Sequence, residues 1–144
     1  MSNIIYIDGT NLRLGRMASR VAKYLLNGNK VVIVNVEKVV VSGRRNAIIE
    51  DYKKWLSIRT WKNPEKVGPK RHKSPDRLVY HAIKNMLPKR PSGLKALKRL
   101  KVYIGIPEEL KSVNFTQIEE AHVKYLRGPY VTLEEISKSL GWSG

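Results

Sequence analysis

The chain has no cysteine among its 144 residues, which excludes disulfide bonds and metal sites built on thiolates. No apolar run comes near the roughly 20 residues that a membrane-spanning helix needs. The first residues do not follow the charged-then-apolar pattern of a leader. Together these absences favour a cytoplasmic protein that binds no membrane.

Acidic residues are also scarce, because 28 Lys and Arg stand against 12 Asp and Glu, a formal net charge of +16. The excess is concentrated in residues 53–101, which contain 16 basic and two acidic residues. Residues 102–144 contain four basic and six acidic residues instead. A solvated surface usually mixes both signs, so the middle segment indicates a polyanionic partner, and nucleic acid is the commonest one.

Motifs for catalysis are missing as well. The turn after the first predicted strand has glycines only at Gly9 and Gly15. It therefore matches neither of the glycine patterns that bind nucleotide phosphates, GxGxxG and GxxxxGK followed by Ser or Thr. We interpret Gly9 as a turn glycine, and Gly15 as either a close-packing position or a place where the backbone approaches phosphate. The histidines at 72, 81 and 122 lack metal-ligand spacing, and carboxylates for acid–base catalysis are few. We expect no enzyme, cofactor, metal or small-molecule substrate.

Alternating strand and helix patterns predict an α/β fold in a chain of one-domain length. The run over residues 30–36 is rich in valine, which is typical of a central strand covered on both faces. It follows a strand and a helix, so a right-handed unit with parallel strands is expected. We predict strands over residues 4–7, 30–36, 39–41 and 101–104, and helices over residues 14–26, 46–59, 75–86 and 94–100.

Each helix or strand predicted within residues 74–105 has one apolar side that can enter a core and one positively charged side. Ser74 and Pro75 are residue types that begin a helix. This helix is followed by a turn rich in proline and glycine and then by a lysine-rich helix. We interpret the whole stretch as the surface that carries the protein's function. The first helix carries an apolar face of Leu78, Val79, Ala82, Ile83 and Met86, and a basic face of Arg77, His81 and Lys84.

Three other segments add positive charge to this surface. Arg44 and Arg45 lie at the entry to the second predicted helix, and residues 60–73 form a long basic loop with no helix or strand pattern. A loop of that length is usually functional or disordered, and it could become ordered on a phosphate backbone. Trp61 within it either stacks on a base or fills the core. The helix over residues 14–26 contributes Arg13, Arg16, Arg20 and Lys23 on one face.

Residues 108–144 differ from the rest in composition and carry two capping-box patterns. One runs from Thr116 to Glu119 and the other from Thr132 to Glu135, and each predicts the start of a short amphipathic helix. We expect this acidic segment to form a helical C-terminal extension that packs on an α/β body of residues 1–107.

Cations on several elements, without a single helix that could read a groove, suit recognition of folded RNA by its shape. A general nucleic-acid or anionic-lipid binder is the alternative, in which the α/β body only carries charge. A salt titration against folded RNA and random duplex would separate the two hypotheses.

Residues 4–107 contain three groups of residues in the order typical of one known family. They are Ile7-Asp8-Gly9 with Leu14-Gly15-Arg16-Met17-Ala18-Ser19 and Val21-Ala22; Val34-Asn35-Val36-Glu37 through Val41-Ser42-Gly43; and His81-Ala82-Ile83-Lys84-Asn85-Met86-Leu87-Pro88-Lys89 with Gly93, Ala96-Leu97, Leu100-Lys101-Val102-Tyr103 and Gly105. The chain resembles the L-thirteen family of large-subunit ribosomal proteins. It lacks the insertion that bacterial members carry after the second strand, so it resembles the archaeal and eukaryotic branch.

The resemblance implies a three-layer α/β/α fold with a small, mainly parallel four-stranded sheet. It implies a non-catalytic, structural protein that acts as a monomer within the ribosome, bound to large-subunit rRNA and neighbouring ribosomal proteins. The RNA contacts carried over from the family are Arg16, Lys84, Asn85, Pro88, Lys89 and Gly93. Those expected from charge and position are Arg13, Arg20, Lys23, Arg44, Arg45, Lys62, Lys66, Lys70, Arg71, His72, Lys73, Arg77, His81, Arg90, Lys95, Lys98 and Arg99.

Overall fold

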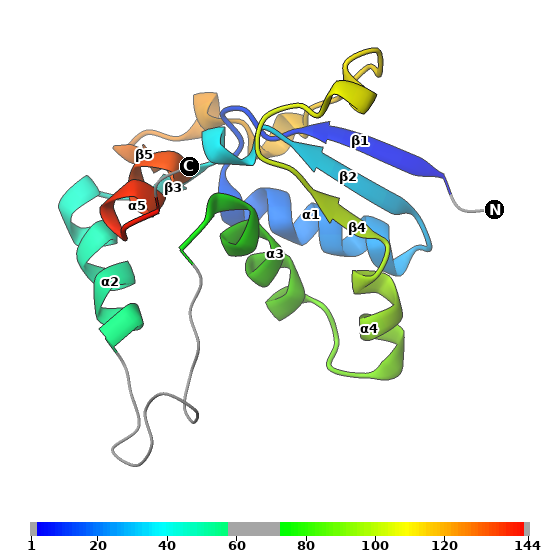
Figure 1. The fold of residues 1–144 in the computed structure, drawn as a ribbon, viewed down its shortest axis with the longest axis horizontal. Helices are drawn as coiled ribbons and strands as arrows, with labels where there is room; N and C mark the ends of the chain where they lie inside the picture. Colours follow the sequence, from blue (N-terminus) through cyan, green and yellow to red (C-terminus); the bar gives the residue numbers. More distant parts are fainter. Residues whose placement is uncertain (1–2, 58–72, 143–144) are drawn as a thin grey trace.

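A parallel three-stranded sheet forms the centre of the computed structural model, which describes residues 3–57 and 73–142 (Figure 1). Its strands are β1 (Ile4–Asp8), β2 (Lys30–Val34) and β4 (Leu100–Val102), in the order β1-β2-β4. β2 therefore pairs on both sides, as its valine-rich sequence predicts. The crossover between β1 and β2 is α1 (Leu14–Leu26), whose bounds agree with the predicted helix.

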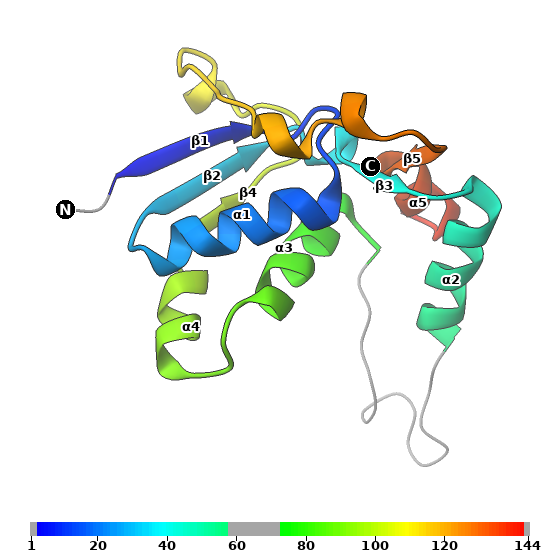
Figure 2. The same ribbon diagram turned by 180° about the vertical axis from the view of Figure 1, so that it is seen from behind.

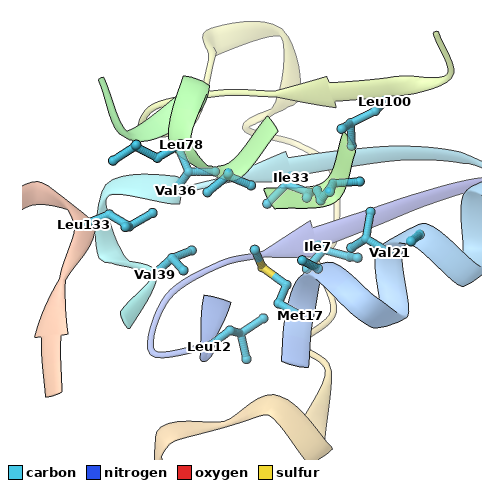
Figure 3. Packing of buried hydrophobic residues seen from close by; sticks show 14 of the residues in the cluster. Ile7, Leu12, Met17, Val21, Ile33, Val36, Val39, Leu78, Leu100 and Leu133 are labelled. Atoms are coloured by element: carbon cyan, nitrogen blue, oxygen red, sulfur yellow. The ribbon is translucent and has the colours of Figure 1, made fainter. Parts of the chain in front are cut away.

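The helices α1, α3 (Pro75–Met86) and α4 (Pro91–Leu97) lie on the same side of the sheet (Figures 1 and 2). Strand order advances in one direction, so right-handed crossovers bring successive helices to one face. Alternation along β2 sends the fully buried Val31 and Ile33 towards these helices. Figure 3 shows Ile33 close to Ile7 and Val21 in this core.

A second, antiparallel ladder lies beyond the carboxyl ends of the parallel strands (Figure 1). It joins β3 (Val40–Ser42) to β5 (Tyr130–Thr132), and α2 (Arg45–Ser57) and α5 (Leu133–Ser139) pack beside it. The chain leaves the parallel sheet at Asn35, whose left-handed φ of 56° ends β2 and starts the 3-10 turn η1 (Val36–Lys38).

The predicted α/β class is confirmed, and two details of the expected architecture differ. Within the described residues the parallel sheet has three strands rather than four, because the run predicted as a strand over residues 39–41 pairs with β5 instead. The α1–α3–α4 layer covers one face of the sheet, and the described residues place no α-helix on the other face (Figure 2). The expected third layer is therefore absent from the described part of the chain.

Element boundaries differ where proline or a long-range contact intervenes. α4 begins at Pro91 rather than at Leu94, because proline suits the first helical turn. The second capping box is confirmed, since the Glu135 amide donates to the Thr132 hydroxyl at 3.4 Å. The first is wrong: the segment around Thr116 runs parallel to the edge of β1. The chain there forms 3-10 turns, η2 (Glu108–Leu110), η3 (Glu119–Ala121) and η4 (Val123–Tyr125).

The acidic C-terminal segment contributes to the same core as the sheet. Leu133 and Ile136 are fully buried, and the Leu133 amide donates to the Val39 carbonyl at 2.8 Å. Figure 3 shows Leu133 facing Val39. Hydrophobic side chains from residues 118–140 thus bury apolar surface against residues from the first half of the chain.

Asp8 fixes the turn at the carboxyl end of β1. Its Oδ1 accepts from the Thr10 hydroxyl at 2.7 Å, the Thr10 amide at 3.0 Å and Asn35 Nδ2 at 3.1 Å. Burial alone raises the pKa of the Asp8 carboxyl, but the hydrogen bonds from Thr10 and Asn35 outweigh it and leave the pKa below its ordinary value. The ionised form therefore ties β1 to the end of β2.

We expect Asp8→Asn to lower the free energy of unfolding by about 1 kcal/mol at pH 7, because charged hydrogen bonds become neutral ones. The pKa of the Asp8 carboxyl is lower in the folded protein than the unfolded value of about 3.9, so the ionised carboxylate stabilises the folded state above that pH. This contribution to stability is lost as the pH falls through the folded-state pKa. Urea unfolding should show the difference between the two proteins shrinking below about pH 4.

Asp51→Asn on α2 is the matched control, because Asp51 is exposed and has no hydrogen-bond or ion-pair partner in the described part of the chain. A stability gap between Asp8→Asn and the parent that stayed constant from pH 7 to pH 3 would contradict the assigned role.

Candidate nucleic-acid interface

The turn between α3 and α4 presents cations from a well-anchored backbone. Residues 77–107 contain eight Lys and Arg and no Asp or Glu. Lys84, Lys89 and Arg90 are all exposed, and none has an ion-pair partner among the described residues. Between them the buried Leu87 anchors the turn in the core. The geometry gives a fixed group of positive charges that no carboxylate neutralises.

Gly93 holds this turn closed. It is buried, and a Cβ built on it would lie 1.8 Å from the Pro88 carbonyl oxygen. Backbone therefore packs directly on backbone where α4 begins, and only glycine fits. The predicted contact residues divide accordingly: Asn85, Pro88 and Lys89 are exposed at the surface, whereas Gly93 shapes the turn from inside.

The basic face of α1 is split between free and engaged side chains. Arg16 and Lys23 are exposed and unpaired within the described residues. Arg13 instead donates through Nη2 to the Glu120 carbonyl at 2.7 Å, and Arg20 forms an ion pair with the Glu120 carboxylate. The acidic turn η3 thus covers half of the predicted basic face.

A hollow of about 600 Å³ lies at the start of α1, between that helix, β3 and α3. The first turn of α1 has no acidic residue and no side-chain cap, so its positive dipole end is not neutralised there. Ser19 and Ser42 line the hollow beside Arg16. Sequence reasoning missed the two serines, because 23 positions separate them and no local pattern relates them.

Gly9 and Gly15 differ in the space beside them. A Cβ on Gly15 would meet nothing within 4 Å, so Gly15 is not a close-packing position. A Cβ on Gly9 would lie 2.8 Å from Val39 Cγ2, so the turn glycine is also the close-packing one.

The remaining predicted contact residues are spread over several elements. Arg45 lies 3.5 Å from the Glu135 carboxylate, and His81 is half-buried with its ring against that of Tyr80. Arg99 donates to the Leu25 carbonyl at 2.6 Å, at the negative end of α1. Besides Arg45, the exposed ones are Arg44, Lys73, Arg77, Lys95 and Lys98. Five predicted contact residues lie outside the described part of the chain: Lys62, Lys66, Lys70, Arg71 and His72. Trp61 lies outside it too.

The exposed cations of the α3–α4 turn and of α1 suit binding of a polyanion. Within residues 3–57 and 73–142 there is no group of three or more His, Asp or Glu side chains that could hold a metal ion. The same residues include no helix long and apolar enough to cross a membrane.

Comparison with known proteins agrees with the geometry. The family model described as "Ribosomal protein L13" matches residues 2–109, three quarters of the chain. The chain belongs to the ribosomal protein L13 family. The predicted family is confirmed, and with it the prediction of a non-enzymatic protein, because this family is structural.

Archaeal relatives match over nearly the full chain. The large ribosomal subunit protein uL13 of Saccharolobus solfataricus is 44% identical over 141 residues, 98% of this chain and 95% of the relative. That of Picrophilus torridus is 45% identical over 139 residues, 96% of this chain and 97% of the relative. That of Methanocaldococcus jannaschii is 42% identical over 136 residues, 94% and 96% respectively. The similarity thus extends beyond residue 109 into the C-terminal segment.

We expect Gly93→Ala to destabilise the protein by about 1–3 kcal/mol, because the added methyl group would push against the Pro88 backbone. Gly15→Ala is the matched control, since its methyl group has open space in α1, and we expect it to be neutral or slightly stabilising. Chemical denaturation measures both variants. Equal stabilities for Gly93→Ala and Gly15→Ala would rule out the proposed backbone contact.

Proposed function

We propose that this chain binds large-subunit rRNA through the α3–α4 turn and the exposed basic side of α1, and so stabilises the subunit during assembly. As a member of a ribosomal protein family, it is a structural constituent of the large ribosomal subunit in the cytoplasm. The observation that carries the proposal is the acid-free segment over residues 77–107, in which Lys84, Lys89 and Arg90 are exposed around a turn anchored by the buried Leu87.

Counterion release would supply most of the affinity. Each phosphate that a lysine or arginine neutralises frees a condensed cation, which makes binding strongly salt-dependent. Contacts of this kind position the protein without reading base sequence. Specificity for folded rRNA then comes from shape, because the turn, α1 and the start of α2 hold their cations at fixed spacings.

The turn is preorganised for such binding. Leu87 and Gly93 fix its backbone before RNA arrives, so less conformational entropy is lost on binding than for a loop that must first become ordered. Neighbouring ribosomal proteins are proposed as further partners, with the chain acting as a monomer among them. The acidic turn η3, with Glu119 and Glu120, is the part of the C-terminal segment least suited to phosphate.

We expect Lys84→Ala combined with Lys89→Ala to weaken binding to transcribed large-subunit rRNA domains by at least about tenfold near 0.1 M salt. The slope of log K against log salt should fall by about 2, one for each phosphate contact removed. Filter binding across a salt series measures both quantities. Thermal unfolding should stay unchanged, because both side chains project from the core.

The double variant Lys111→Ala with Lys138→Ala is the matched control, because it removes the same charge from the C-terminal segment. If this control weakened rRNA binding as much, net charge rather than the α3–α4 turn would explain the affinity. Equal affinity of the parent for rRNA domains and random duplex at physiological salt would favour a general polyanion binder.

A further inference from the structure

The face of the parallel sheet opposite the helices contains a hollow of about 260 Å³. The register places Tyr6, Val32 and Lys101 in one row across the three strands. Ile4 pairs with Lys30 in the next row, and Tyr103 follows β4 at the same hollow. These positions alternate with the buried ones, so their side chains point away from α1, α3 and α4.

Apolar and aromatic groups form much of this surface. Ile4, at the start of β1, is 49% exposed. Tyr6 and Tyr103 lie beside it, and Tyr6 is held in place by an edge-on contact with Phe115, with 6.0 Å between ring centroids. Leu110 from η2 closes one side.

Positive charge surrounds the hollow. Four of its lining residues are basic and one, Glu109, is acidic. None of the four basic residues forms an ion pair within the described structure, and Arg99 Nε is buried without a hydrogen-bond partner. The basic residues are Lys30, Lys98, Arg99 and Lys101.

We infer that this hollow binds an unpaired RNA base, with its flanking phosphates held by Lys30 and Lys101. Tyrosines stack on any base because every base has a π face, and lysines beside them attract the backbone. An acidic peptide would use the lysines but would gain less from the two tyrosines. The inference rests on the proposed function only in taking RNA as the polyanion.

The site is distinct from the α3–α4 turn, because the sheet lies between them. The protein would then contact RNA on both sides: phosphates of folded helices on the helical side and an unpaired nucleotide on the open sheet face. Such an arrangement would let one small domain hold a paired and an unpaired segment together.

The test uses the full chain, labelled with nitrogen-15, and two probes of equal length, an oligoadenylate pentamer and an abasic pentamer. Amide signals of Tyr6, Val32 and Lys101 should shift with oligoadenylate. The abasic pentamer should bind about tenfold more weakly, because stacking is lost while the phosphates remain. Unshifted strand amides, or equal affinity for both pentamers, would overturn the inference.

Two variants locate the site. Lys101→Ala changes only an exposed strand side chain, and Tyr103→Leu removes the ring while keeping an apolar group. Each should weaken oligoadenylate binding by about tenfold, whereas Lys53→Ala on α2 should leave it unchanged. Wild-type affinity in both site variants, or tighter binding of a pentaglutamate peptide than of oligoadenylate, would overturn the assignment to a base.

The Lys84→Ala and Lys89→Ala double variant separates this site from the proposed rRNA interface. It should keep its strand shifts with oligoadenylate even where it loses affinity for folded rRNA. Loss of those strand shifts in the double variant would show that the oligonucleotide uses the α3–α4 turn, and would overturn a separate site.

Discussion

Pairing of β2 on both of its edges is the constraint from which the rest of the structure follows. Val31 and Ile33 are buried because β1 and β4 flank the strand and three helices cover one face. The strand order advances from β1 through β2 to β4 without reversing, so right-handed crossovers bring the helices to that same side. In the described part of the chain only short 3-10 turns lie near the opposite face, which leaves an apolar, basic hollow there.

The positive charge that the surface presents depends on which basic side chains are paired with acidic ones, as well as on how many basic residues the chain contains. Glu120 engages Arg20 through its carboxylate and Arg13 through its carbonyl, and both arginines belong to the basic face of α1. Exposed ion pairs contribute little stability, so the main effect of this contact is to reduce the positive potential on one side of α1. The α3–α4 turn contains no acidic residue, and its lysines and arginines form no ion pair within residues 3–57 and 73–142.

The turn between α3 and α4 combines a constrained backbone with exposed positive charges. The close approach of Gly93 to the Pro88 carbonyl leaves the backbone little freedom, and Leu87 ties it to the core. Lysines on such a support keep their spacing, which matters when the partner is recognised by the positions of its phosphates. In this protein one glycine therefore links local packing to the proposed recognition of RNA.

The sequence by itself determined the features that depend on neighbours within a turn or two. The bounds of α1, the start of α3 at Pro75 and the cap at Thr132 could be predicted, because periodicity and capping are local. The family and the concentration of basic residues in the middle of the chain were predictable too, since motif order and charge can be read along the sequence.

Only the tertiary structure decided which strands pair and which cations stay free. The partner of β3 is a strand near the C-terminus, and Arg13 meets a carbonyl 107 positions away. Within the described residues the predicted third layer is absent, because strand order, which sets the side that each helix covers, depends on such long-range pairing. Contacts of this range leave no periodic signal, so folding alone settles which faces of this chain stay open to solvent.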